Sequence, residues 1–189
     1  MPTRDNVKHE KRVDFCLALQ AYDRPTVKLL RRTARNLPHE TVNHTEFDQL
    51  STRPIFLSIE AKGSDGNSTQ ALYQMSTWLS AHWIFLQSLL DMKYGKGQAS
   101  RAQHQMQNHL PFLPGIIISG HDWTFVTATR GREREEGGRE TDIWTGIHLG
   151  STRSLCGIAQ IIASLQTLAE WSVSTYWPWF KELISEAGT

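Results

Sequence analysis

The sequence predicts an α/β (α+β) domain in which a central mixed β-sheet is flanked by helices. Residues 53–62 alternate apolar and polar side chains, which is typical of a strand. Residues 67–92 and 155–171 carry apolar stripes at helical spacing. The order along the chain is strand, short helix, strand, long helix, hairpin, strand and helix, and this order predicts helices packed on a mixed sheet.

The central strand presents two different faces. Its apolar face is expected to join the core and consists of Ile55, Leu57, Ile59 and Ala61. Its polar face ends with Glu60 and Lys62, which lie two residues or about 6.6 Å apart along a strand. The pair can converge on one small ligand, or it can form a solvent-exposed salt bridge worth only about 0–1 kcal/mol. Taken alone, these two residues favour the salt bridge.

The first strand is predicted at residues 11–19 and contributes a second acid. Asp14 shares the small-residue face of this strand with Cys16 and Ala18, while the larger apolar side chains lie on the other face. Asp14 is therefore either a site acid or an edge-strand residue that faces water.

A short helix is predicted from Asp23 to about Asn36, with Pro25 near its first turn. It carries the densest basic patch of the chain, at Lys28, Arg31, Arg32 and Arg35. A basic helix face is more often solvated than bound to nucleic-acid phosphates, and both interpretations remain open.

The second half of the chain supplies the remaining elements. Gln74 and Trp78 lie one turn apart on the long helix that begins at residue 67 or 68. The other expected elements are a surface insertion at about 93–110, a hairpin of strands at 116–119 and 123–129, a charged mobile loop at 130–141, a strand at 142–149, a helix at 155–171 that packs on the sheet, and an aromatic cap of the core at 177–180. The expected organisation is a frayed segment at 1–10, one domain at 11–181 and a C-terminal tail at 182–189.

Composition excludes several classes of protein. The formal net charge is +1, so any nucleic-acid site must be a local basic patch. Cys16 and Cys156 give neither a disulfide framework nor zinc-ligand spacing, and both are expected to be buried thiols in a reducing compartment. There is no apolar run of membrane-spanning length and no secretory signal at the start. The chain is therefore expected to be intracellular, in the nucleus or cytoplasm, and not secreted.

The acids and the lysine form a coherent hydrolytic site if Asp14 and Glu60 lie on neighbouring strands. Two carboxylates about 4 Å apart repel by roughly 4 kcal/mol at an effective dielectric constant of 20, so a cation must offset them. Lys62 supplies one charge, and a divalent ion supplies two. Oxygen ligands with open water positions suit Mg²⁺ or Mn²⁺, which can polarise a phosphodiester and acidify a bound water.

An ordered series of motifs resembles the PD-(D/E)XK nuclease superfamily. Asp14 on one strand, the sequence Glu60-Ala61-Lys62 ending the next, and Gln74-x-x-x-Trp78 on the following helix carry the resemblance. The chain is more closely similar to a group of such domains found mainly in fungi, over about residues 11–181. The further motifs are Val13-Asp-Phe-Cys16, Val42-Asn-His-Thr45, Leu113-Pro-Gly-Ile-Ile117, Gly120-His-Asp-Trp123, Leu149-Gly-Ser-Thr152 and Trp177-Pro-Trp-Phe180.

The resemblance implies a restriction-endonuclease-like core and a metal-dependent nuclease acting on nucleic acid, DNA rather than RNA. It implies that Asp14 and Glu60 bind Mg²⁺ (or Mn²⁺), that the Ala61 carbonyl is a further ligand, and that Lys62 is the catalytic lysine. Gln74 matches a glutamine that supports the site in some subgroups.

Two alternatives remain open. Many members of the superfamily add an acid on a helix before the first core strand, and few residues precede Asp14 here. This difference favours a catalytically inactive nuclease-like fold that binds nucleic acid or protein. The second alternative is an α/β domain in which the acids and the lysine form only a structural cluster.

Overall fold

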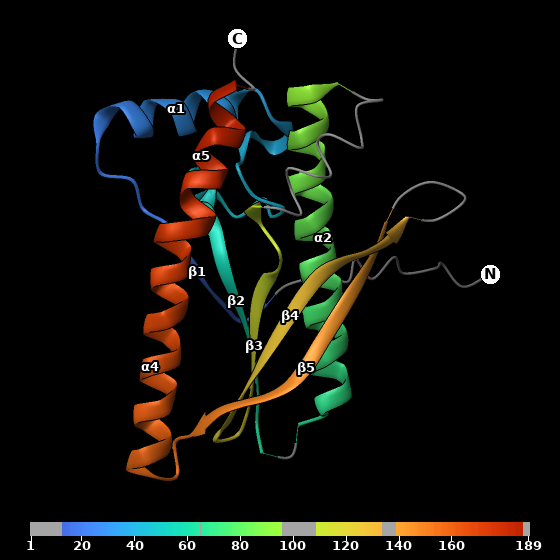
Figure 1. Cartoon of the computed structure of the whole chain (residues 1–189), viewed down its shortest axis with the longest axis vertical. Coiled ribbons are helices and arrows are strands. Elements are labelled where there is room, and N and C mark those ends of the chain that lie inside the picture. Colours follow the sequence, from blue (N-terminus) through green and yellow to red (C-terminus); the bar gives the residue numbers. More distant parts are fainter. Residues whose placement is uncertain (1–12, 65, 96–108, 134–138, 187–189) are drawn as a thin grey trace, which may run out of the picture.

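The computed structural model describes residues 13–64, 66–95, 109–133 and 139–186, and they form one mixed sheet with helices on both faces (Figure 1). The strands are β1 (Phe15–Ala18), β2 (Ile55–Lys62), β3 (Leu113–Ser119), β4 (Asp122–Glu133) and β5 (Arg139–Ser151). They lie in the order β1-β2-β3-β4-β5, and only the β2–β3 pair is parallel. This arrangement confirms the predicted α+β class with a central mixed sheet.

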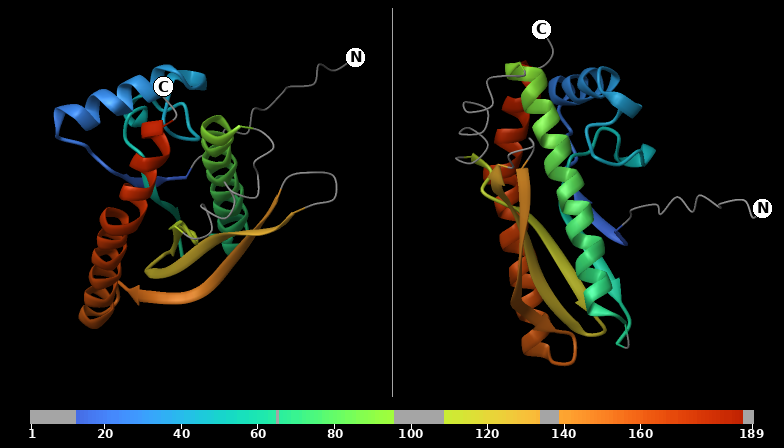
Figure 2. Two further views of the ribbon diagram at one scale, coloured as in Figure 1. Left: turned by 45° about the horizontal axis from the view of Figure 1, so that its top comes forward. Right: turned by 90° about the vertical axis from the view of Figure 1, so that its right-hand side faces the viewer.

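The helices are α1 (Arg24–Arg35), α2 (Ser68–Tyr94), α4 (Leu155–Trp171) and α5 (Trp177–Glu186). Short 3-10 turns lie at Pro38–Glu40 and Asp48–Leu50, and a π-helical turn at Ser172–Tyr176 joins α4 to α5. Helix α2 is the crossover between the parallel strands β2 and β3, as such a connection requires. Figure 1 and Figure 2 show α1 crossing one end of the molecule, while α2 and the α4–α5 pair lie on opposite sides of the sheet.

Strand β2 is buried on both faces, so the expectation of a possible solvated face was wrong. Six of its eight residues, from Ile55 to Glu60, are buried. Helix α2 covers the face that carries Ser58, because the Trp78 indole N–H donates to the Ser58 hydroxyl at 2.8 Å. Gly115 of β3 permits this close approach, since a Cβ there would lie 2.8 Å from the Met75 sulfur.

Strand β1 is the edge of the sheet and is shorter than predicted. The larger side chains Phe15 and Leu17 are exposed, whereas Cys16 and Ala18 on the opposite face are partly buried. The apolar face of this strand is thus the more exposed one. Alternation identified the strand but could not show which face the helices would cover.

The β3–β4 hairpin is confirmed, and its strands are longer than predicted. Residues 130–133 and 139–141, expected in a mobile charged loop, extend β4 and β5 through pairings such as Arg130 with Thr141. In an outer hairpin, charged side chains can face solvent while the backbones of the two strands pair through hydrogen bonds. A charged sequence is therefore not sufficient evidence for a loop. Residues 134–138 of that loop, the segment 1–10 and most of the insertion at 93–110 lie outside the described residues.

Helix α4 packs on the sheet through a narrower stripe than expected. Gly157, Ile161 and Leu168 are its buried residues. Other members of the predicted stripe are exposed, above all Leu155 with 87% of its surface accessible, and Ile158 and Ile162 are exposed as well. The predicted helix is correct, but its apolar residues are divided between the sheet and solvent.

The C-terminal residues complete the core. Trp179 and Phe180 are buried, as the prediction of an aromatic cap requires. Helix α5 then continues to Glu186 and buries Leu183 and Ile184, where a tail was expected from residue 182. Among the described residues, no helix is long and apolar enough to cross a membrane.

The two cysteines differ from the expectation of buried thiols. Cys156 at the start of α4 is exposed. Cys16 on β1 is half-buried, and this burial raises the pKa of its thiol.

Two histidines pack together between α2 and the segment that precedes β2. The ring of His44 stacks on that of His82, with centroids 4.4 Å apart, and meets the edge of Trp78. Burial lowers the pKa of His82 to about 3, and burial together with the nearby His82 holds the pKa of His44 well below its usual range. Both imidazoles are therefore neutral at neutral pH, consistent with a structural role for His44.

We expect the free energy of unfolding to fall as the pH drops from 7 to 5. The unfolded histidines take up protons below about pH 6.5, whereas folded His82 resists protonation until about pH 3. Each such histidine contributes a slope of up to about 1.4 kcal/mol per pH unit in that window. Urea denaturation at several pH values should show a shallower fall for His82→Phe, and an unchanged fall would contradict the burial of a neutral His82.

Candidate active site

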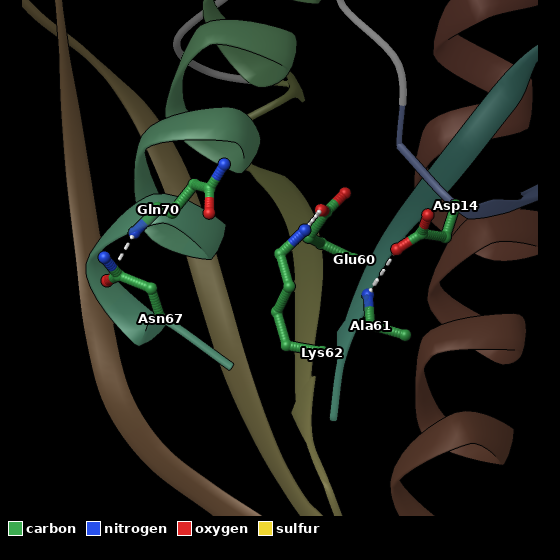
Figure 3. A network of polar contacts seen from close by, with 6 residues as sticks. All are labelled: Asp14, Glu60, Ala61, Lys62, Asn67 and Gln70. Carbon is green, nitrogen blue, oxygen red and sulfur yellow. Dashed lines mark hydrogen bonds and ion pairs between the residues drawn. The ribbon is translucent and has the colours of Figure 1, made fainter. Parts of the chain in front are cut away.

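Pairing of β1 with β2 brings the first acid beside the second. Phe15 lies opposite Ile59 and Cys16 opposite Ser58, so the antiparallel register continues to place Asp14 at the level of Glu60. An Asp14 carboxylate oxygen accepts the backbone N–H of Ala61 at 2.8 Å. Figure 3 shows Asp14 reaching the backbone of Ala61 from one side of β2, while Glu60 and Lys62 extend from the other. Asp14 and Ala61, 47 positions apart in the chain, thus meet at one end of β2.

Glu60 and Lys62 form a buried ion pair. The Lys62 Nζ lies 2.6 Å from Glu60 Oε1. Glu60 is 1% exposed, whereas the Lys62 side chain is 21% exposed. The expectation of a solvent-exposed salt bridge was therefore wrong, because α2 covers this face of β2. The second Glu60 oxygen, Oε2, is buried and has no hydrogen-bond partner.

The end of β2 and the start of α2 fix the position of Lys62. The strand ends at Lys62, and the turn that follows needs glycine at position 66, because a Cβ there would lie 2.6 Å from the Lys62 Cβ. The Asn67 side chain then caps α2 by accepting the backbone N–H of Gln70 at 3.1 Å (Figure 3). The Lys62 carbonyl accepts the backbone N–H of Gly120 at 2.8 Å, which ties this end of β2 to the β3–β4 turn.

Gln74 lies on the part of α2 that covers Glu60. Helix α2 runs back along β2, and Trp78 is bonded to Ser58. One helical turn toward the start of α2 advances about 6 Å, which matches the two-residue step from Ser58 to Glu60 along the strand. The Gln74 side-chain oxygen is buried and without a partner, and no hydrogen bond joins Gln74 to Glu60 or Lys62.

Comparison with known proteins agrees with this geometry. A model of the PD-(D/E)XK nuclease superfamily matches residues 2–177. The chain belongs to the PD-(D/E)XK nuclease superfamily. Its mixed sheet flanked by helices is the restriction-endonuclease-like fold, and membership implies a nucleic-acid substrate. No curated protein and no solved structure matches the chain significantly. The closer similarity to fungal-type domains stays a prediction.

Superfamily nucleases generally use divalent metal ions, and three groups here suit such an ion. Glu60 Oε2 is a buried oxygen without a partner, and only one Asp14 oxygen is engaged, by Ala61. The Ala61 carbonyl points to the same side of β2 as its N–H, toward Asp14, as strand geometry requires. The described residues contain no group of three or more histidine, cysteine, aspartate or glutamate side chains placed to hold a metal. Two carboxylates and one carbonyl leave positions for water and phosphate, as is common for Mg²⁺.

The predicted basic residues lie far from the acids. Lys28, Arg31, Arg32 and Arg35 are exposed on α1. Helix α1 follows β1, whose end is bonded to the start of β2 by Leu19 N–H to the Pro54 carbonyl. Six residues along β2 then separate Pro54 from Glu60, a distance of about 20 Å. The candidate site acids and the basic side chains of α1 thus lie toward opposite ends of β2.

Two features of this region were not found from the sequence. One is the Trp78–Ser58 hydrogen bond, which fixes α2 on the polar face of β2. The other is a cavity beside Asp14 that includes Phe47, a residue of the segment between α1 and β2. Neither contact has a local sequence signal, because each joins residues at least 20 positions apart.

Removing Lys62 should destabilise the fold by leaving the Glu60 charge buried and unpaired. We expect Lys62→Met to lower the free energy of unfolding at pH 7 by about 3 kcal/mol, the lower end for a broken buried pair because Lys62 is partly exposed. The matched control is the double variant Glu60→Gln with Lys62→Met, which removes both charges and should recover most of the loss in denaturant titrations. A double variant as unstable as the single one would show that the loss reflects packing of the lysine stem.

Proposed function

We propose that this protein is a metal-dependent nuclease that hydrolyses phosphodiester bonds in DNA. The observation that supports it best is Glu60, a buried carboxylate with one oxygen held by Lys62, the other without a partner, and Asp14 at the same level of the sheet. A solvated or purely structural acid would not be buried with a free oxygen, because such a group costs about 1–3 kcal/mol or more.

In this proposal Asp14, Glu60 and the Ala61 carbonyl hold Mg²⁺ (or Mn²⁺). The ion, when bound, polarises the phosphodiester and acidifies a water. Lys62, fixed 2.6 Å from Glu60, places a positive charge where the attacking water and the developing negative charge meet. Gln74 is proposed to support the site from α2, because its unpartnered oxygen can accept a hydrogen bond from a water at the metal.

We further propose that α1 binds DNA phosphates. The helix contains five basic residues and no acid, and none of these residues forms an ion pair with another described residue. Their side chains surround an open hollow of about 720 Å³, lined by Arg24, Lys28, Arg31, Arg32 and Arg35 together with Tyr22, Val27 and Asn36. Cations without acidic partners are free to replace the counterions of a nucleic-acid backbone.

A nuclease-like fold that binds nucleic acid or protein without catalysis is the second candidate. It is favoured by the ligand set, since the described residues hold no group of three or more histidine, cysteine, aspartate or glutamate side chains that could bind a metal ion. It predicts binding of nucleic acid without metal-dependent cleavage, so the same assays separate the two functions.

The decisive variant for catalysis is Glu60→Gln, which keeps the size of the side chain but removes the charge. We expect Mg²⁺-dependent cleavage of DNA to fall by at least about 100-fold, as when a transition-state stabiliser is lost. Calorimetric titration with Mg²⁺ should show binding in the parent protein and little in the variant. Undiminished cleavage by folded Glu60→Gln protein would contradict the proposed role.

The α1 surface is tested by the salt dependence of DNA binding. Each lost phosphate contact should reduce the slope of log K against log salt concentration by about 0.9 for duplex DNA and about 0.7 for single strands. Arg31→Ala with Arg35→Ala is therefore expected to lower the slope by roughly 1.4–1.8. The matched control is Arg31→Lys with Arg35→Lys, which keeps both charges and should keep the slope. Equal slopes for the two double variants would exclude phosphate contacts by these residues.

A further inference from the structure

A cavity of about 220 Å³ opens directly beside the proposed metal position. Asp14 lines one end of it. The other walls come from β1, from α2 and from the segment before β2, and include Cys16, Thr45, Phe47, Leu50 and Trp78.

The chemistry of these walls excludes a phosphate and fits a flat aromatic ligand. Among the described residues that line it there is no basic side chain, and the Asp14 carboxylate would repel an anion. Aromatic and aliphatic side chains dominate, while Thr45 supplies a hydroxyl for one hydrogen bond.

The walls are held by contacts outside the cavity. Trp78 is buried, donates to Ser58 at 2.8 Å and packs against His44. The segment that carries Phe47 is tied to β2 by Asn43, whose side chain bonds the carbonyls of Leu50 and Arg53 and the N–H of Ile55. The cavity is thus preformed, with Phe47 at its mouth and 56% of that side chain exposed.

We propose that this cavity binds an unpaired nucleobase of the substrate. Phe47 offers an accessible aromatic surface and Trp78 forms part of the buried wall, and stacking of a base on an aromatic side chain is a recurring mode of single-strand recognition. Asp14 belongs to both the cavity and the proposed metal site, so the base and the scissile phosphate belong to neighbouring parts of one strand. A base stacked inside a duplex cannot enter the cavity. The preferred substrate is therefore single-stranded DNA or a duplex with an unpaired nucleotide at the cleavage point.

This inference rests on the proposed function only for the position of the phosphate, and base binding is measured without cleavage. The probe is a single-stranded oligonucleotide in which the fluorescent base 2-aminopurine is moved along the sequence, in buffer with EDTA. We expect its fluorescence to be quenched on binding at one position, and the corresponding duplex to bind more weakly without quenching.

The variant Phe47→Ala removes the aromatic surface at the mouth of the cavity. We expect it to bind the single strand at least about tenfold more weakly and to lose the quenching, since stacking of one base contributes about 1–3 kcal/mol. Phe47→Trp should restore both. The matched control is Trp144→Ala, which removes an aromatic residue that is 62% exposed on β5, at the opposite edge of the sheet, and should bind like the parent. Thermal melting confirms that the variants are folded.

The outcomes separate this inference from the proposed function. Phe47→Ala protein that binds and quenches like the parent, or a duplex that binds as tightly as the single strand, would overturn the nucleobase cavity. If Mg²⁺-dependent cleavage persisted in that case, the proposed nuclease would stand without the cavity. Quenching that depends on Phe47, with no cleavage by any protein, would support the cavity and reject the nuclease.

Discussion

The burial of Glu60 between β2 and α2 is the constraint on which the arrangement of this region depends. A carboxylate that is 1% exposed must be compensated by charge and hydrogen bonds, and Lys62 at 2.6 Å compensates only one of its oxygens. The other oxygen has no hydrogen-bond partner among the described residues. The close packing of α2 on Ser58 and Gly115 keeps water away and makes this requirement strict.

The position of this acid at the end of an inner strand, next to an edge strand, also decides how a substrate can approach. Strand β1 is short and is the edge strand of the described sheet, so no other described strand covers Asp14 or the Ala61 carbonyl. A site between two inner strands of a sheet would be closed to a polymer, whereas a site beside the edge strand has one side open. The loop before β2, anchored by Asn43, borders this open side with Phe47. An open edge combined with a preformed wall suits a strand of nucleic acid better than a small enclosed ligand.

The distribution of charge explains how a protein with a formal net charge of +1 can recognise a polyanion. The basic side chains of α1 lie at the other end of β2 from the acids, about 20 Å away along six residues. In the proposed function, this separation keeps the cations from neutralising the carboxylates that hold the metal, and α1 is a second point of attachment for the substrate. In the proposed function, α1 attaches the phosphate backbone, and the acids at the end of β2 act on one phosphodiester bond.

The sequence by itself determined the class of fold, the order of the elements and the family. Alternation at residues 53–62 and the helical stripes depend only on local spacing, and the Glu60-Ala61-Lys62 motif is local as well. The sequence also placed Asp14 on the strand next to Glu60, because resemblance to a family carries information about contacts between distant residues. Only the tertiary structure decided which faces are buried. It placed both faces of β2 in the interior, exposed Phe15 and Leu155, and brought Phe47 beside Asp14. Burial is a property of what other segments cover, and those segments lie tens of residues away, beyond the reach of any local pattern.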